Sequence, residues 1–319
     1  MSPLLFALLL PTAPLLRLEG VDAKKCAESG TIRASFVELE MEGRWRPQAA
    51  SAYRLVIDGK ALGAPPLEPR AFSETDEPLA VGIVLQVNLA WQRDLPRVLD
   101  GVTKLLDGLP PRTKVWLYAY GDQVISLAAA ATPARTKERL SDVRASDRAR
   151  AASRQAIRSA LDAVEGLPGR SVVVVISDGL DDVPSRDEIR ALGNLARARR
   201  VPVLPVAYSP TDERGPFLDL AELARRSSGL FRWAENIDDL GPELVSVADA
   251  LSSAWVIDYA MPEPCEKSHE VQIIRDELRS EPVTILAQEG SPKPVWPFVA
   301  GIVGVLLAGA ALVITRRRA

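Results

Sequence analysis

The sequence predicts an α/β protein: a doubly wound, mostly parallel sheet, a small flanking β-domain and a C-terminal transmembrane helix. Three observations predict it. Between residues 79 and 254, continuous apolar runs alternate with segments of helical periodicity. Short β-like segments stand before and after this region, and a long uncharged apolar stretch lies near the C-terminus. Strands that are apolar on both faces and joined by helical crossovers form a parallel sheet that helices cover on both sides.

Composition limits the classes of partner. The 319 residues include 39 basic and 42 acidic side chains, for a net charge of −3, and 47% of them are hydrophobic. That content supports one large domain or two modest ones with a real core. A near-neutral balance gives no global electrostatic footprint for nucleic acid, so we expect no nucleic-acid partner.

Residues 1–23 are predicted to be a secretory signal peptide. Residues 3–10 form a short apolar run, and Val21 and Ala23 are small residues suited to precede a cleavage site. The usual basic residue at the extreme N-terminus is missing, and Pro11 and Pro14 interrupt the run. The alternative is a hydrophobic lead that packs on the domain or anchors the chain uncleaved.

Residues 24–78 are predicted to hold N-terminal β-segments, at 31–41 and 52–59, separated by a polar stretch. The Asp58–Gly59 step predicts a hairpin turn. Residues 63–78 are rich in proline and acid, which is typical of a linker or of an edge strand that ends before the next domain.

Residues 79–254 are predicted to form the α/β domain. Its apolar runs, which we interpret as buried strands, are residues 79–87, 113–121, 171–179 and 201–209, with a shorter one at 229–234. The segments between them carry apolar residues at helical spacing. In open sheets of this kind a site lies beyond the carboxyl ends of the strands, which directs attention to the loops that follow.

Residues 255–290 return to short β-like segments, which we expect to pair with residues 24–78 as a small β-domain. Cys26 and Cys265 stand near the two ends of this body. In an exported protein an even cysteine count predicts a disulfide between them. Two free buried thiols are the alternative. Residues 291–294 would then link this body to the next segment.

Residues 295–314 are uncharged and long enough to cross a bilayer as a helix. Trp296 suits one interface, and Arg316, Arg317 and Arg318 follow at the other, as the positive-inside rule expects. A buried helix would not explain these arginines. The sequence therefore predicts a single-pass membrane protein with a periplasmic or extracellular body and a cytoplasmic tail at 315–319.

The order of these strands resembles the von Willebrand factor type A (VWA) family, in particular its bacterial membrane-tethered members. The resemblance covers residues 79–254 and depends on the strand VGIVLQVNLAW paired with the later strand SVVVVISDGLDD. It implies a site in which Asp-x-Ser-x-Ser at the first strand, a later threonine and an aspartate bind Mg²⁺ or Mn²⁺. Such a cation prefers hard, anionic oxygens in octahedral geometry.

This chain departs from that pattern at most positions. Gln86 stands for the first aspartate, Asn88 for the first serine and Ala90 for the second, and the threonine falls near Ala151 or Ala152. Only Asp178 remains. We therefore expect a degenerate site that holds no metal, and no cofactor.

Asp178, Asp181 and Asp182 form a local acidic cluster after the later strand. One interpretation is a Ca²⁺ site on this loop. The other is structural: Asp178 accepts backbone hydrogen bonds, Gly179 turns the chain, and the other two carboxylates favour the N-terminus of the helix that begins near Ser185.

Other chemistry is scarce. His269 is the one histidine of the sequence, it lies outside the α/β region, and no glycine-rich phosphate loop follows any predicted strand. We therefore expect no enzyme. A cation-rich segment could face an acidic partner or anionic lipid, or could be a solvated helix surface. Its basic residues are Arg135, Lys137, Arg139, Arg144, Arg148, Arg150, Arg154 and Arg158.

These observations favour a membrane-anchored interaction or scaffold module that binds another protein through the loop face carrying Gln86, Asn88, Ala90, Asp178 and Asp181. One alternative is a Ca²⁺- or Mg²⁺-binding adhesion protein or regulatory subunit that uses the Asp178–Asp182 loop. Another is a structural role in which the α/β domain is a spacer between the membrane and a partner held by the β-domain.

Overall fold

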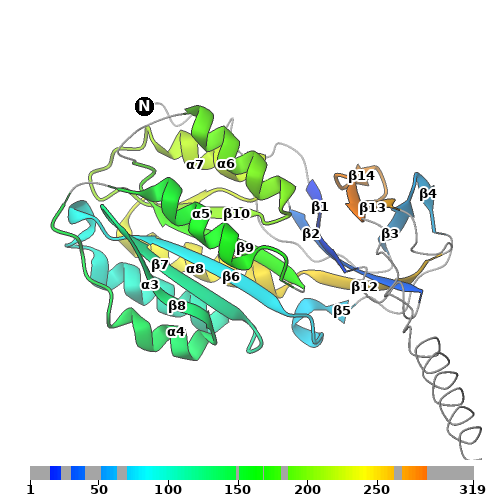
Figure 1. Cartoon of the computed structure of the whole chain (residues 1–319), viewed down its shortest axis with the longest axis horizontal. Coiled ribbons are helices and arrows are strands. Elements are labelled where there is room, and N and C mark those ends of the chain that lie inside the picture. Colours follow the sequence, from blue (N-terminus) through cyan, green and yellow to red (C-terminus); the bar gives the residue numbers. More distant parts are fainter. Residues whose placement is uncertain are drawn as a thin grey trace, which may run out of the picture.

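The computed structural model describes residues 15–22, 30–39, 52–62, 70–148, 151–167, 169–180, 186–261 and 268–285. Its central sheet has the strand order β11-β10-β9-β6-β7-β8 (Figure 1). The strands are parallel except β8, which pairs antiparallel with β7. The mostly parallel α/β architecture predicted from the apolar runs is confirmed. The strands are β6 (Leu79–Gln86), β7 (Lys114–Tyr120), β8 (Val124–Ala131), β9 (Arg170–Ser177), β10 (Val203–Ala207) and β11 (Arg232–Trp233).

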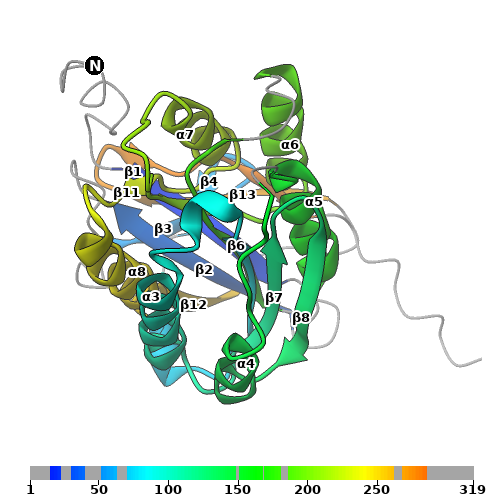
Figure 2. The same ribbon diagram turned by 90° about the vertical axis from the view of Figure 1, so that its left-hand side faces the viewer.

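Helices cover both faces of this sheet (Figures 1 and 2). One face packs against α3 (Leu95–Gly108), α4 (Pro133–Leu140) and α8 (Ile237–Ser252). The other packs against α5 (Ser153–Val164), α6 (Arg186–Ala198) and α7 (Phe217–Arg226). The spacing of the buried residues explains why these segments are helical, as in α3, where Val98, Val102 and Leu105 lie on one stripe.

The central strand β6 is buried along its whole length. Val81, Ile83 and Leu85 point into the core beneath α3 and α8, while Ala80 and Val84 point into the core beneath α5. This two-sided burial is what a continuous apolar run predicts. It fixes the direction of β6 and thereby places Gln86 at the carboxyl edge of the sheet.

The flanking segments form a small β-sandwich. Its first sheet has the order β1-β2-β12-β5, and the second has the order β14-β13-β3-β4, with β15 also paired to β13. A separate apolar core, which includes Phe36, Leu55 and Ile273, lies between the sheets. The strands are β1 (Leu15–Asp22), β2 (Thr31–Leu39), β3 (Arg54–Ile57), β4 (Lys60–Ala61), β5 (Arg70–Ala71), β12 (Trp255–Ala260), β13 (His269–Arg275), β14 (Leu278–Arg279) and β15 (Val283–Ile285).

Segments from both sides of the α/β domain meet in this sandwich. Strand β12 pairs antiparallel with β2, and β13 pairs antiparallel with β3. The β3–β4 connection is a two-residue turn in which Asp58 and Gly59 have φ values of 49° and 78°. That geometry is the hairpin turn predicted from the Asp-Gly step.

The predicted signal peptide overlaps this sandwich. Strand β1, at Leu15–Asp22, pairs antiparallel with β2, and the side chains of Leu16 and Leu18 belong to the sandwich core. Arg17, between these leucines, is also buried, and its guanidinium donates to the backbone carbonyl of Ser228. Residues 15–22 are therefore part of the folded body, whereas the apolar run at 3–10 lies outside the described residues.

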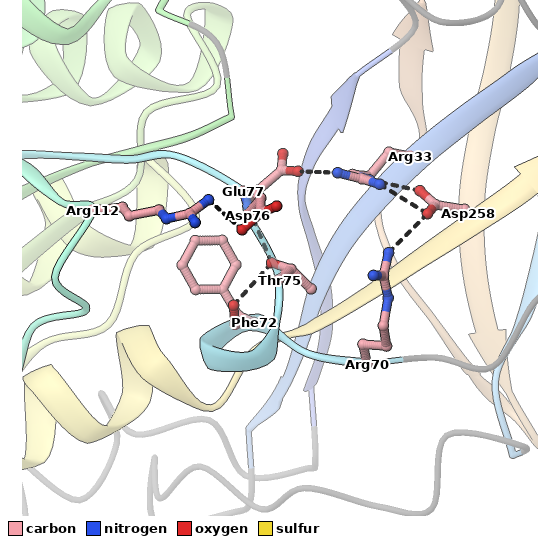
Figure 3. A network of polar contacts seen from close by, with 8 residues as sticks. All are labelled: Arg33, Arg70, Phe72, Thr75, Asp76, Glu77, Arg112 and Asp258. Carbon is pink, nitrogen blue, oxygen red and sulfur yellow. Dashed lines mark hydrogen bonds and ion pairs between the residues drawn. The ribbon is translucent and has the colours of Figure 1, made fainter.

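A polar junction joins the sandwich to the α/β domain (Figure 3). The guanidinium of Arg33 on β2 binds Asp258 of β12, with Nε 2.6 Å from Oδ1, and also lies 3.2 Å from the carboxylate of Glu77, just before β6. Arg70 approaches Asp258 at 3.1 Å. The contacts of Arg33 with Asp258 and Glu77 raise its pKa, chiefly through the hydrogen bond to Asp258.

Several predictions concern parts of the chain that the structure does not describe. Cys26 and Cys265, the linker at 291–294, the span at 295–314 and the tail at 315–319 all lie outside the described residues. Within the described part of the chain, every helix is too short or too polar to cross a membrane. The disulfide and the membrane helix thus stay predictions.

Candidate functional site

The candidate site lies at the carboxyl edge of the central sheet, which faces the viewer in Figure 2. The strands β6 and β9 are parallel neighbours, with Leu85 opposite Ile176. Their ends therefore bring Gln86 and Asp178 together. The amide Nε2 of Gln86 donates a hydrogen bond to Asp178 Oδ2 at 3.0 Å.

Three N–H groups donate to the carboxylate of Asp178, which is 1% exposed. Oδ2 accepts from Gln86 Nε2 and from the indole Nε1 of Trp91, at 3.0 and 3.1 Å. Oδ1 accepts from the backbone N–H of Leu180 at 2.8 Å. Both oxygens are thus bound within the chain.

The carbonyl end of the same glutamine side chain is also satisfied. Gln86 Oε1 accepts from the backbone N–H of Asp178 at 3.0 Å and from the hydroxyl of Ser177 at 2.9 Å. The hydroxyl of Tyr120 in turn donates to Ser177 Oγ at 2.8 Å. Because a backbone N–H can only donate, this pattern fixes the orientation of the amide. Gln86 therefore bridges the backbone and the carboxylate of Asp178.

A second polar pair lies beside this network. The ring of Tyr208, at the end of β10, packs edge-on against Trp91 with 5.6 Å between ring centroids. Its hydroxyl donates a hydrogen bond to Oδ2 of Asp94, the residue just before α3, at 2.6 Å. Burial and this carboxylate raise the pKa of Tyr208, so its hydroxyl remains a donor across the physiological range.

Burial also raises the pKa of Asp178. The hydrogen bonds from Leu180, Trp91 and Gln86 act in the opposite direction, because they stabilise the ionised carboxylate. Burial is the larger effect. The site thus holds its carboxyl group in surroundings that favour the protonated form more than water does.

These residues do not fit a hexacoordinate Mg²⁺ or Mn²⁺. Such a cation needs oxygen lone pairs, and in this arrangement N–H hydrogens point at the carboxylate oxygens where the cation would bind. Among the described residues there is also no group of three or more His, Cys, Asp or Glu side chains that could hold a metal. The geometry is that of a hydrogen-bonded carboxyl group.

The other predicted site residues differ in their burial. Asn88 is buried and Ala90 is exposed, one residue before Trp91. Ala151 is buried, and the backbone N–H of Ala152 donates to the carbonyl of Gly121 at 2.7 Å, so a methyl group stands where the resemblance implies a threonine.

The other predicted acidic residues and the histidine are not part of this network as the structure describes it. Asp181 and Asp182 lie outside the described residues. His269 lies in β13 of the sandwich, where its Nδ1 is 2.7 Å from Asp58 Oδ2. The histidine is thus part of the β3–β13 pairing and not of the sheet edge.

The sequence analysis did not predict four residues of this site: Trp91, Tyr120, Ser177 and Tyr208. The available signal was position: each lies at or just beyond the end of an apolar run whose carboxyl end meets the others at one edge. An aromatic residue with an N–H or O–H group needs a partner when buried, so its presence there indicates a polar network.

Several basic side chains of the cation-rich segment form ion pairs or hydrogen bonds within the chain. Arg148 binds Asp122 at 2.7 Å, Lys137 binds Asp107 at 2.5 Å, and Arg154 pairs with Glu188. Arg139 lies 3.4 Å from Asp142, and Arg144 donates to the carbonyl of Val143. These contacts favour the interpretation of this segment as a solvated surface.

A shallow cavity of about 420 Å³ opens beside the network, between the end of β9 and the start of α7. Gly179 borders it and has a φ of +80°. The lining residues are Gly179, Leu180, Arg186, Gly215, Pro216, Leu218 and Asp219. The carboxyl edge thus offers a concave surface whose lining includes one cation, Arg186, and one carboxylate, Asp219.

No protein-family model and no curated protein matches the sequence. Solved structures similar to the chain include BatB from Bacteroides thetaiotaomicron, at 15% identity over 55% of this chain and 100% of that one, with a TM-score of 0.44. A von Willebrand factor type A protein from Catenulispora acidiphila shares 9% identity over 88% of this chain and 74% of that one, with a TM-score of 0.46. Proximal thread matrix protein 1 from the mussel byssus, with zinc in its MIDAS motif, shares 13% identity over 60% of this chain and 50% of that one, with a TM-score of 0.46. At such low identities and TM-scores, the chemistry of the site follows from this chain's own residues alone.

Proposed function

We propose that this chain is a membrane-anchored, extracytoplasmic VWA-type module that binds another protein through the carboxyl edge of its sheet, without a metal ion. The hydrogen-bond network of Asp178 carries the proposal. Its carboxylate oxygens already accept three N–H groups out of roughly four possible acceptor positions, so the network opposes a role of the carboxylate in bridging a cation to a partner.

The surface above this network supplies the contacts for a partner. Leu89 is 46% exposed, and Ala90, Gln92 and Arg93 beside it are also exposed. An arginine can bind a partner's carboxylate through two parallel hydrogen bonds. In this proposal the arginine takes the place of the metal ion that, by the resemblance, binds the partner's carboxylate in metal-binding members of the family. We propose recognition of an apolar side chain next to an acidic one, and no catalysis.

The metal-free site is tested by thermal unfolding of the full chain in EDTA and then in millimolar Mg²⁺, Mn²⁺ or Ca²⁺. An ion that binds only the folded state must raise the midpoint temperature of unfolding. We expect no shift with any of the three ions. A saturable shift that disappears in Asp178→Asn would contradict the proposal and make metal-bridged adhesion, or the Ca²⁺ loop at Asp178–Asp182, the better account.

Partner binding is tested by a photo-crosslinking amino acid placed at Leu89 in the full chain within its native membrane. Val245, on α8 and 37% exposed, is the matched control position. We expect a discrete adduct from position 89 that weakens in Arg93→Glu. Equal labelling from positions 89 and 245 would remove the loop face as the binding surface and favour the spacer role.

A further inference from the structure

Strand β1 of the sandwich lies in a stretch that local sequence signals assign to a signal peptide (Figure 1). It pairs antiparallel with β2 from Leu15 to Asp22, with one irregularity in the register. Strand β2 in turn pairs with β12, so β1 is the outer strand of a sheet built from segments on both sides of the α/β domain. A cut after Ala23 would remove this strand entirely.

The leucines of β1 help to fill the sandwich core. Leu16 is 1% exposed and Leu18 is 8% exposed. Phe36 of β2, which lies opposite Leu18, is fully buried in the same cluster. Burial of apolar side chains is the main favourable contribution to folding. A sandwich without β1 would leave this side of its core open to water, so the strand is a part of the fold.

The side chain between these leucines, Arg17, reaches the α/β domain. Successive side chains of a strand point to opposite faces, and Val37, opposite Arg17 on β2, belongs to a core of the α/β domain. Arg17 is 6% exposed, and its guanidinium donates to the backbone carbonyl of Ser228, just beyond α7. A buried cation is costly unless it is hydrogen-bonded. This contact spans 211 positions of the sequence, and a leader that is removed before folding takes no part in such a contact.

We propose that the mature protein retains residues 15–22. A leader peptidase, which hydrolyses one peptide bond with water, then acts before Leu15 and not after Ala23. Val21 is small enough for a cleavage site, but it pairs with β2 and packs against the sandwich core. Retention of β1 is independent of the function proposed above, because β1 takes no part in the Asp178 network.

The first test is N-terminal sequencing, with intact-mass measurement, of the protein expressed from its full sequence and purified from its native membrane. We expect an N-terminus at or before Leu15. An uncut chain and a chain cut within the preceding residues both support the proposal, because each keeps β1 whole. A mature chain that begins at Leu16 or later, for instance at Lys24, overturns it.

Unfolding of the purified protein provides a second measurement, with the variants Leu16→Ala and Leu89→Ala. Each shortens a leucine, which is buried in β1 at position 16 and 46% exposed at position 89. We expect Leu16→Ala to lower the midpoint temperature of unfolding by at least about 4 °C, because it opens a cavity in the sandwich core. Leu89→Ala should change the midpoint by less than about 2 °C. An unchanged midpoint in Leu16→Ala overturns the proposal, since a residue that is removed with a leader cannot affect the stability of the mature protein.

Discussion

At the scale of the residue, the glutamine at the strand tip is the informative feature. A glutamine carries an acceptor and a donor on one side chain, so Gln86 receives the backbone N–H of Asp178 and donates to its carboxylate. An aspartate at this position would only accept, and it would place a second carboxylate near the first. The amide of Gln86 thus donates a hydrogen bond to the carboxylate at the strand tip, where the resemblance implies a metal ion.

The raised pKa of Asp178 predicts a pH-dependent contribution to stability. A folded-state pKa above the unfolded one means that the folded chain binds the proton more tightly. The contribution is therefore fully present below the unfolded value of about 3.9 and is lost as the pH rises through the folded pKa. Asp178→Asn removes this titration, so the loss of unfolding free energy that it causes should be larger at pH 4 than at pH 7.

Urea unfolding of the wild type and of Asp178→Asn at the two pH values gives this difference directly. Asp238→Asn is the matched control. Asp238 is an exposed carboxylate that pairs with Arg97, and the side chains of Asp238 and Arg97 are 78% and 63% exposed. If the loss for Asp178→Asn grows with pH instead, the N–H donors outweigh burial and the carboxylate is stabilised in its ionised form.

At the scale of the element, the turn after β9 determines how closely α7 approaches the site. Gly179 has a φ of +80°, and a Cβ atom built on it would lie 2.6 Å from the carbonyl oxygen of Pro216. A side chain is therefore excluded both by backbone conformation and by contact with the segment before α7. This turn also positions the N–H of Leu180 on Asp178.

Gly179→Ala is expected to lower the unfolding free energy by roughly 2–5 kcal/mol, through strain at positive φ and overpacking against a backbone atom. Gly166→Ala is the matched control, because Gly166 has a φ of +67° with nothing within 4 Å of its Cβ position. It should show the conformational part alone, about 1–2 kcal/mol. Equal losses in urea unfolding would mean that α7 yields to the added methyl group.

At the scale of the whole molecule, the β-sandwich has its own core and also contributes residues to one core of the α/β domain. Val37 of β2, Phe72 and Val256 of β12 pack in the same cluster as the strands and helices of the α/β domain. The guanidinium of Arg170 also stacks over Phe72, 4.6 Å from the ring centroid. The boundary predicted at residue 79 thus crosses a continuous apolar core, and we expect both parts to unfold together.

The partly buried ion pairs at the junction provide a test. Arg33→Met leaves Glu77, which is 6% exposed, without the guanidinium, whereas Asp258 keeps Arg70 at 3.1 Å. Removing one partner of a fully buried pair typically costs about 3–5 kcal/mol, and for this partly buried junction we expect a loss of about 1–3 kcal/mol. Arg97→Met, which breaks the exposed pair with Asp238, should cost at most about 1 kcal/mol.

Unfolding of both variants is followed by tryptophan fluorescence and by far-ultraviolet circular dichroism. Coincident transitions are expected in both, because the shared core couples the two parts. Separate transitions in Arg33→Met would show that the sandwich and the α/β domain are independent units that the ion pairs hold together.

The sequence by itself determined the layered α/β class, the sequence order of most strands and helices, and the Asp-Gly hairpin. These depend on local signals: apolar runs, helical spacing and turn residues. Local signals failed where the residue types are ambiguous. Alanine is depleted in strands, so the alanine-rich edge strand β8 was not predicted. Residues 15–22, which the sequence places in a predicted signal peptide, pair with β2 in the structure.

The composition of the site, in contrast, depends on how the folded chain brings distant residues together. Gln86 and Asp178 are 92 positions apart in the sequence, and Trp91 and Asp178 are 87 apart. The sheet order brings their strands together, but whether a carboxylate oxygen meets an N–H group or stays open depends on rotamers and packing at the strand tips. A hydrogen bond requires a donor–acceptor distance within a few tenths of an ångström and a nearly linear angle at the hydrogen. The pattern of apolar residues along a chain does not encode that precision.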